Sequence, residues 1–406
     1  MTPTPFDLNL RHLRALTAIV ARGSMSAAAE AVSLSQPALT QGLAKLEAQL
    51  GAALFERRTD GMAPTEAGGA LTARAEAAFA HLGAATRAGS RGFARPEQLM
   101  TATQLHAFLA LADAGSFVGA GVATHLSQPA IHRAVRDLEQ VCGVVLVERR
   151  GRGIALSEAG RRLARGIRLA STEIAAGIAE AGPDRGSAGR VAIGAMPLSR
   201  AELLPHALAR VSREMPGARF DVAEGSWREL VEPLRDGTLD MMIGALRPQP
   251  GPPDLEQQPL LDDRLVIVGR AGHPLAGVAQ PGREELRAYP WIVGRSGAPI
   301  RALWESMFAG GALPEAPIEC GSVMVIRGVL RESDFLTLLS PDQVALEIDS
   351  GMLAMIGPEL ESSGRVIGVT TRAGWRPTRV QARFLEVLGG GIESGDHLKG
   401  ASCSAA

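Results

Sequence analysis

The apolar and polar positions in the first 160 residues follow one helical pattern that occurs twice. Residues 13–68 and 105–160 align without a gap at a constant offset of 92 residues, and 24 of the 56 aligned positions are identical. In each copy the pattern predicts a helix, a Gly-Ser break, a short helix, a tight turn and a helix that opens with Ser-Gln-Pro. The period is too long for a solenoid repeat, so it indicates a small domain that was duplicated.

The helix that opens with Ser-Gln-Pro has a packed face and a polar face. Its serine suits the N-cap, and its proline falls in the first turn, where the missing N–H costs nothing. Apolar residues recur at steps of three and four, at Leu39, Leu43 and Leu46 and again at Ile131, Val135 and Leu138. The opposite face carries Thr40, Gln41 and Lys45, or in the second copy His132, Arg133 and Arg136. A recognition helix in a DNA major groove needs both faces.

A hairpin follows this helix in each copy. It begins with Glu-Arg-Arg, contains glycine, and leads into Thr-Glu-Ala-Gly or Ser-Glu-Ala-Gly, which opens a longer helix. We expect the hairpin to be a wing whose arginines meet DNA phosphates.

The ordered set of motifs, Gly-Ser, then Ser-Gln-Pro-Ala, Leu-Glu, Glu-Arg-Arg and Thr/Ser-Glu-Ala-Gly, resembles the DNA-binding domain of LysR-type transcriptional regulators. The alternative, two ordinary helical hairpins, would satisfy the periodicity but not the motif set. The resemblance implies double-stranded DNA as a partner. The predicted DNA-binding residues are Ser35, Gln36, Pro37, Thr40, Gln41, Lys45, Arg57, Arg58, Ser127, Gln128, Pro129, His132, Arg133, Arg136, Arg149, Arg150 and Arg152.

The two copies differ in charge. Residues 39–76 hold four Lys and Arg against five Asp and Glu, whereas the matching residues 131–168 hold nine against four. Gly42 should also weaken the first recognition helix by about 1 kcal/mol relative to alanine. One difference favours the first copy, because its Glu30 and Val32 follow the family pattern more closely than Val122 and Thr124 of the second copy. We therefore expect both copies to fold and the second to contribute more DNA affinity.

From Arg190 the pattern changes to short apolar strands that alternate with helices. The run begins with strands at 191–195, 219–224 and 239–245, separated by helices that open at Ser199 and Ser226, and this order implies a parallel sheet. Strands at 255–261 and 264–268 follow, a second lobe is expected from about Glu284, and strand 365–371 with helix 378–388 returns to the first lobe. The arrangement resembles the periplasmic-binding-protein-like effector domain of the same family.

The predicted fold class is multidomain, with two all-α winged helix-turn-helix domains followed by a two-lobed α/β effector domain. We expect winged helix-turn-helix domains at 9–68 and 102–160, each followed by a linker helix (69–96 with its connection, and 161–185), the effector domain at 189–389 and a disordered tail at 390–406. In the family such linker helices pair antiparallel between two subunits. Here we hypothesise that the duplication supplies both halves on one chain, an intrachain pseudo-dimer able to read an asymmetric operator.

In two-lobed α/β proteins ligands bind between the lobes, at the carboxyl ends of strands and the amino ends of helices. Single serines at such places are more often plain N-caps, but several converge on one predicted edge. Gly194 to Arg200 and Thr370 to Thr378 are similar to the galactose-binding-protein regulators, which implies a sugar or a small organic acid. The predicted effector-binding residues are Met196, Pro197, Leu198, Ser199, Ser226, Arg247, Ser296, Gly297, Ser322 and Val323.

Composition limits the classes of protein to which the chain can belong. The net charge is −1, so DNA affinity must come from local patches. Neither a secretory signal nor an apolar stretch long enough for a membrane span is apparent, so we expect a cytoplasmic protein. Cys142, Cys320 and Cys403 lie far apart, which argues against zinc or a disulfide framework and leaves a redox-sensing pair as the alternative to inert thiols.

We expect no cofactor, no metal and no enzymatic activity, because His206 and His273 accompany no nucleophile motif or metal-ligand spacing. A transport receptor would share the C-terminal fold but has no use for DNA-reading domains. Beyond DNA and the effector, the expected partners are RNA polymerase and further copies of the chain. An effector that closes the lobes must bind one arrangement of the protein better than another to alter transcription.

Overall fold

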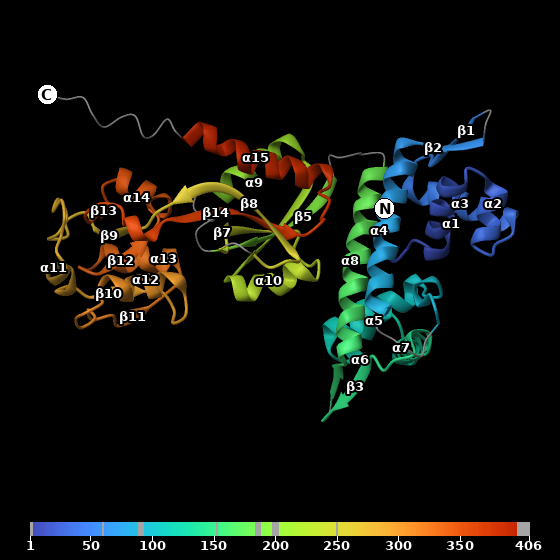
Figure 1. Ribbon diagram of the computed structural model, residues 1–406, viewed down its shortest axis with the longest axis horizontal. Coiled ribbons are helices and arrows are strands. Elements are labelled where there is room, and N and C mark those ends of the chain that lie inside the picture. Colours follow the sequence, from blue (N-terminus) through green and yellow to red (C-terminus); the bar gives the residue numbers. More distant parts are fainter. Residues whose placement is uncertain are drawn as a thin grey trace. The chain divides into compact units, whose positions relative to one another are not determined.

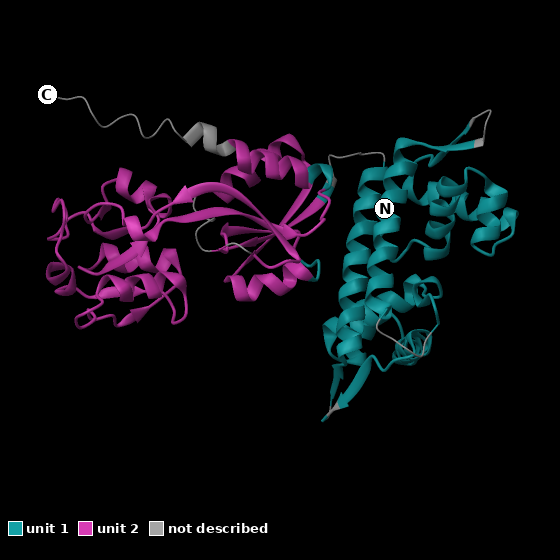
Figure 2. Ribbon diagram, viewed as in Figure 1, with its two compact units in different colours: residues 1–189, 236–238, 378–380 teal, residues 190–235, 239–377, 381–406 magenta. Residues whose placement is uncertain are grey.

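The computed structural model describes residues 3–58, 61–87, 93–151, 153–182, 188–196, 203–248 and 251–395, and leaves out the side chains of residues 58, 61, 150, 188 and 391–395. The chain forms two compact units (Figure 2). Unit 1 contains residues 1–189 with the short segments 236–238 and 378–380, and unit 2 contains the rest. Each unit is described by itself.

Unit 1 repeats one order of elements. The first set is α1 (Leu10–Arg22), α2 (Met25–Ala31), α3 (Gln36–Leu50), β1 (Phe55–Arg58), β2 (Gly61–Pro64) and α4 (Glu66–Thr86). After the short helix η1 (Pro96–Gln98), the second set is α5 (Ala102–Ala114), α6 (Phe117–Thr124), α7 (Gln128–Cys142), β3 (Val147–Arg150), β4 (Gly153–Leu156) and α8 (Glu158–Ala181). We call residues 10–64 module 1 and residues 102–156 module 2. The all-α description was wrong in one respect, because β1–β2 and β3–β4 are two-stranded antiparallel sheets.

The motif residues cap the helices as the sequence predicts. Gly23 and Gly115 end α1 and α5 in the left-handed region, at φ of 67° and 62°. The hydroxyl groups of Ser35 and Ser127 accept hydrogen bonds from the N–H groups of Ala38 and Ala130 at the start of α3 and α7. These contacts fix the length and direction of the two helices that the sequence assigns to DNA.

The Leu-Glu and Thr/Ser-Glu-Ala-Gly motifs hold each hairpin to its module. Glu47 Oε1 accepts a hydrogen bond from the N–H of Leu54 at 2.8 Å, and Glu139 Oε1 accepts one from Leu146 at the same distance. The glycine of the second motif then packs on the carbonyl group of the same leucine. A Cβ atom on Gly68 would fall almost on the oxygen of Leu54, and one on Gly160 almost on that of Leu146. Only glycine fits this approach.

Helices α4 and α8 lie side by side and antiparallel (Figure 1). Gly177 of α8 contacts Leu71 and Arg74 near the start of α4, and Gly166 contacts His81 and Ala85 near its end. A single cluster of buried apolar residues runs through both modules and both long helices, so unit 1 has one shared core. Arg14 of α1 adds a polar contact, because it donates hydrogen bonds to the carbonyl groups of Glu97 and Met100 just before α5.

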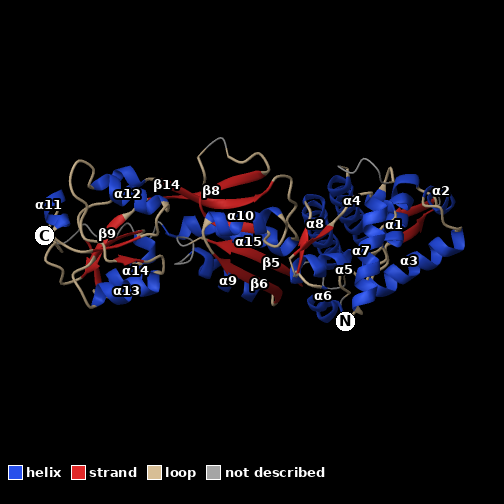
Figure 3. Cartoon of the chain, turned by 90° about the horizontal axis from the view of Figure 1, so that it is seen from below, coloured by secondary structure: helices blue, strands red, loops and turns tan. Residues whose placement is uncertain are grey.

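The first lobe of unit 2 is a five-stranded sheet in the order β6-β5-β7-β14-β8. Its strands are β5 (Ala188–Ala195), β6 (Gly217–Glu224), β7 (Met241–Ala245), β8 (Leu255–Asp263) and β14 (Arg365–Arg372). Helix α10 (Trp227–Arg235) covers one face, whereas α9 (Leu203–Glu214) and α15 (Arg379–Gly395) cover the other (Figures 1 and 3). The expected parallel pairing of β5 with β7 is confirmed, and β14 returns antiparallel to β7 and β8.

The second lobe is a five-stranded sheet in the order β11-β10-β12-β9-β13. It contains β9 (Val266–Arg270), α11 (Arg283–Arg287), β10 (Trp291–Val293), α12 (Pro299–Met307), β11 (Ile318–Glu319), α13 (Val323–Arg331), β12 (Leu336–Leu339), η3 (Pro341–Gln343), α14 (Ala345–Asp349), β13 (Leu353–Met355) and η4 (Glu361–Ser363). The boundary near Glu284 was wrong, since β9 already pairs with β12 and β13. The tail boundary at 390 was also wrong, because α15 continues to Gly395.

Buried polar contacts join the two lobes where the chain crosses between them. Asp263, at the end of β8, accepts hydrogen bonds from Ser340 Oγ and Arg365 Nε, each at 2.7 Å. The N–H of Leu265 donates to Ser363 Oγ at 2.8 Å. These contacts fix the crossing strands from which both lobes extend.

Replacing Gly68 with alanine tests the packing of the Glu-Ala-Gly motif. The added Cβ atom meets a backbone oxygen that cannot move independently, so we expect a loss of roughly 1–3 kcal/mol in the stability of unit 1. Gly69→Ala is the matched control, because the next residue of the same helix has open space around it. Thermal unfolding of both variants should separate them, and equal melting temperatures would contradict this packing.

Candidate DNA interface and effector site

The predicted recognition residues lie exposed on α3 and α7. Among those whose side chains the structure describes, every one predicted on these helices or at their N-caps is exposed: Ser35, Gln36, Pro37, Thr40, Gln41, Lys45, Ser127, Gln128, Pro129, His132, Arg133 and Arg136. Leu39, Leu46, Ile131, Val135 and Leu138 form the buried side of the two helices. Each helix thus presents a polar face to solvent and an apolar face to the core.

Module 1 holds α3 with contacts that the sequence did not suggest. Ser26 Oγ donates to Gln36 Oε1 at 3.2 Å, which restrains the first exposed side chain of α3. Gly42 is buried, and a Cβ atom there would meet the imidazole ring of His12. Gly42 therefore has a packing role as well as a low helix propensity, because the imidazole ring of His12 fills the space that a larger side chain at this position would need. Burial, followed by the charges of Lys45 and Arg11, lowers the pKa of His12.

Module 2 places different residues at the equivalent positions. The counterparts of His12 and Gly42 are Gln104 and Ala134. Module 2 therefore has alanine in place of the glycine, and a side chain without a ring in place of the histidine that packs on it. Gln104 Nε2 donates to Asp137 Oδ2 of α7 at 3.4 Å. The imidazole of His132 stacks on Phe117 of α6, with ring centroids 3.6 Å apart. His132 is therefore exposed but held against the preceding helix.

The arginines that follow the recognition helices lie on the two hairpins and on the long helices. Arg57 and Arg149 are exposed on β1 and β3. The side chains of Arg58 and Arg150 and the whole of Arg152 lie outside the described residues. The charge count of the second copy needs a correction, because Arg168 pairs with Asp113 and Asp236, two aspartates outside the residues that were counted.

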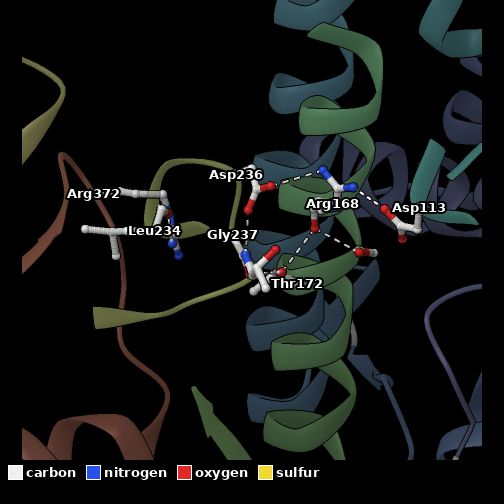
Figure 4. Close-up of polar contacts among 9 residues, drawn as sticks. Asp113, Arg168, Thr172, Leu234, Asp236, Gly237 and Arg372 are labelled. Carbon is white, nitrogen blue, oxygen red and sulfur yellow. Dashed lines mark hydrogen bonds and ion pairs between the residues drawn. The ribbon is translucent and has the colours of Figure 1, made fainter. Parts of the chain in front are cut away.

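Arg168 is a structural arginine of unit 1. Its guanidinium bonds to Asp113 at the end of α5, and its Nη1 atom lies 3.1 Å from Asp236 Oδ2 in the segment that belongs to unit 1 (Figure 4). The carbonyl group of Arg168 also accepts a hydrogen bond from Thr172 Oγ1 at 3.0 Å. Two carboxylates therefore already neutralise it, and it adds little to the positive field of module 2.

The first lobe of unit 2 brings together part of the predicted effector set. Glu229 Oε2 accepts hydrogen bonds from both the N–H and the hydroxyl of Ser226, each at 2.7 Å. The guanidinium of Arg247 lies 4.7 Å above the ring of Trp227, and the backbone N–H of Arg247 donates to Gln257 Oε1 at 2.7 Å. Met196, in contrast, is buried in the apolar cluster under α10. Pro197, Leu198 and Ser199 lie outside the described residues.

The second lobe contributes Ser296, Gly297 and Ser322, which are exposed, and Val323, which is half-buried. Gly297 has a φ of 79°, so it ends the turn before α12 in the left-handed region. Hydrogen bonds from Ser226 and then the charge of Arg295 lower the pKa of Glu229. Arg295, whose charge contributes to this shift, directly precedes Ser296 in the second lobe.

One cavity lies where the sequence assigned no site. It has a volume of about 400 Å³ and is lined by Glu256, Gln257, Gln258, Val369, Thr371, Trp375, Pro377 and Leu385. Trp375 gives it one aromatic wall, and the other residues come mainly from β8, β14 and α15. The strand pattern predicts each element but not that the bend before α15 leaves a hollow beside the sheet.

The structure places the potential metal ligands of the described residues and two of the three cysteines. No group of three potential metal-ligating side chains occurs in the part of the chain that the structure describes. Burial raises the pKa of the Cys142 thiol to about 11, which favours the inert form, and Cys320 is half-exposed. No helix among the described residues is long and apolar enough to cross a membrane.

Known family models match both units. Residues 184–391 match the LysR substrate binding domain, and residues 10–69 and 102–161 each match the bacterial regulatory helix-turn-helix protein of the lysR family. The chain belongs to the LysR family. It is a DNA-binding transcriptional regulator with an N-terminal helix-turn-helix region and a C-terminal effector-binding domain.

Individual LysR-family proteins match over most of their length. HTH-type transcriptional regulator GalR of Pseudomonas putida is 33% identical over 371 residues, which cover 90% of this chain and 93% of that protein. HTH-type transcriptional regulator PcaQ of Agrobacterium fabrum is 29% identical over 72% of this chain and 95% of its own length. Among solved structures, a full-length OxyR from Pseudomonas aeruginosa has a TM-score of 0.53 at 25% identity, covering 72% of this chain and 95% of its own.

Proposed function

We propose that unit 1 is an intrachain pseudo-dimer of two winged helix-turn-helix modules that together read one DNA site. The main support is the geometry of α4 and α8. Gly166 contacts Ala85 in one half of the helix pair and Gly177 contacts Arg74 in the other. The offset of 92 residues converts each contact into the other, as a pseudo-two-fold axis requires.

The comparisons add support for duplication. The helix-turn-helix family model matches two separate segments of the chain. PcaQ is matched over 95% of its length but over only 72% of this chain, which leaves about a quarter of the chain without a counterpart. That remainder is about the size of one module with its long helix.

The two modules present different side chains to DNA. Module 2 exposes Arg133 and Arg136 on α7, where module 1 has Gln41 and Ala44. Arginine recognises guanine through two hydrogen bonds and also attracts phosphate, so module 2 supplies more affinity and more sequence selectivity. Module 1 reads the second half-site through Thr40, Gln41 and Lys45. The operator is therefore asymmetric.

Unit 2 senses a small polar metabolite, a sugar or a small organic acid. Ser226, Arg247, Ser296 and Ser322 offer hydroxyl groups and one cation, and Trp227 offers an aromatic surface beside Arg247. The effector alters transcription by binding one arrangement of the protein more tightly than another. RNA polymerase and further copies of the chain are the partners through which that change acts.

DNA binding by full-length variants tests the pairing of unequal modules. On DNA from upstream of the coding sequence, Arg133→Ala should weaken binding about 5- to 150-fold, the cost of losing one base contact. Gln41→Ala should weaken it less, and Arg219→Ala, an exposed arginine of β6, should leave it unchanged. Footprinting should show two protected half-sites. A single protected half-site in the unaltered chain would contradict the proposal.

Thermal unfolding with hexoses and hexonic acids tests the effector site. A true effector at about 100 times its Kd should stabilise the chain by about 2.7 kcal/mol. Arg247→Ala should abolish the rise in Tm caused by an acidic ligand, whereas Arg219→Ala should retain it. An undiminished rise in the Arg247→Ala variant would place the ligand elsewhere, with the cavity beside Trp375 as the next candidate.

A further inference from the structure

Three charged residues occupy one half of the α4–α8 contact. The guanidinium of Arg74 is almost fully buried, and its Nη1 atom lies 3.1 Å from Glu173 Oε2. Its Nε atom donates to Glu180 Oε2 at 3.0 Å, and a second contact joins Nη2 to the same carboxylate. Burial lowers the pKa of Arg74, but the bonds to Glu180 and then Glu173 outweigh burial and raise it overall. The cluster is thus a compensated buried ion pair.

The other half of the helix pair lacks this cluster. By the offset of 92 residues, the counterparts of Arg74, Glu173 and Glu180 are Gly166, His81 and Ala88. Gly166 packs so closely on Ala85 that a Cβ atom would overlap the methyl group. One half of the contact therefore joins an arginine to two glutamates, whereas in the other half Gly166 packs against the backbone of His81 and the methyl group of Ala85.

This asymmetry makes each long helix unsuited to a second copy of itself. In an antiparallel α4–α4 pair, Arg74 would face His81 and Ala85 of the other copy instead of the two glutamates and Gly177. In an α8–α8 pair, Glu173 and Glu180 would face Gly166 in place of Arg74. Either pairing leaves buried charge without the partner it has here, which is strongly unfavourable.

We propose that Arg74, Glu173 and Glu180 are a pairing code that makes α4 select α8 and reject the same helix of another chain. The occupant of the α4 surface is therefore always an α8 helix, and module 2 is always the partner of module 1. A site with two identical half-sites for module 2 is then excluded by assembly rather than by DNA recognition. The inference rests on the pseudo-dimer proposed above.

Gly166→Arg should reverse the preference. It gives α8 an arginine at the place equivalent to Arg74, so an α8–α8 pair between two chains would contain the charged cluster in both halves. The same arginine cannot fit against Ala85 in the α4–α8 pair. Gly166→Met is the matched control, because it introduces similar bulk without charge.

A cysteine at Ala170 reports the pairing in the full-length chain. By the offset of 92 residues, Gly166 in a self-paired α8 would lie beside residues 173 and 177 of the other copy, so the centre of the pair falls between residues 169 and 172. Ala170 is buried on α8 and lies in this central stretch, where an antiparallel self-pair brings a residue close to its own copy. In chains that also carry Cys320→Ser and Cys403→Ser, oxidation of Ala170→Cys alone should give no covalent dimer. Adding Gly166→Arg should give about tenfold more dimer than adding Gly166→Met. Covalent dimers of the Ala170→Cys chain, or equal yields from the arginine and methionine variants, would overturn the proposal.

A neutralisation series keeps the test decisive if Gly166→Arg does not fold. Arg74→Met should lower the Tm of unit 1 by roughly 5 °C. Removing both carboxylates as well, with Glu173→Gln and Glu180→Gln, should restore most of that loss, because no buried charge is then uncompensated. A triple variant no more stable than Arg74→Met would contradict the charge code. Failure of this code would leave the DNA-binding results unaffected, so the two proposals can be told apart.

Discussion

The packing of α4 against α8 is the contact on which the arrangement of unit 1 depends. The buried apolar residues of both small modules and of α4 and α8 form one continuous cluster, so the two long helices complete the core that each module begins. The same contact sets the spacing between α3 and α7. Stability and DNA reading therefore have a common origin in one helix pair.

Much of unit 1 could be predicted because its motifs have local causes. Ser35 and Ser127 cap α3 and α7 through hydrogen bonds to N–H groups three residues further on. Glycine ends α1 and α5 because the left-handed backbone conformation there favours a residue without a Cβ atom. The roles of Glu47, Gly68 and Gly42 could not be predicted, because each depends on a residue that the fold brings close from elsewhere in the chain. A charge count likewise could not reveal that Arg168 is already paired.

Unit 2 was less predictable. The strands were found approximately, but the sequence does not state which sheet each strand joins, and β9 was therefore assigned to the wrong lobe. Met196 was expected in the effector site because it follows β5, yet its side chain turns into the core. Arg247 and Ser226 remain candidates, since both are held at the predicted edge by Trp227 and Glu229.

Placing two unequal modules on one chain changes what such a regulator can evolve. In a symmetric dimer any substitution alters both half-sites, whereas here α3 and α7 can change separately. The cost is that the two long helices must recognise each other and not themselves. In the pairing proposed above, the ion pair of Arg74 in one half of the contact and the close packing of Gly166 on Ala85 in the other half provide that distinction.

The central claim, that α4 pairs with α8 of its own chain, is tested most directly by a disulfide across the pair. Arg74 Cβ lies 3.1 Å from where a Cβ atom of Gly177 would be, near the separation of about 3.5–4.5 Å in disulfides. In a chain with Arg74→Cys, Gly177→Cys, Cys320→Ser and Cys403→Ser, the substitutions Glu173→Gln and Glu180→Gln are added so that no buried carboxylate loses its partner. Oxidation of this chain should give a disulfide within single chains, measured by mass under denaturing conditions. Disulfide-linked pairs of chains, or free thiols at both positions, would contradict the account.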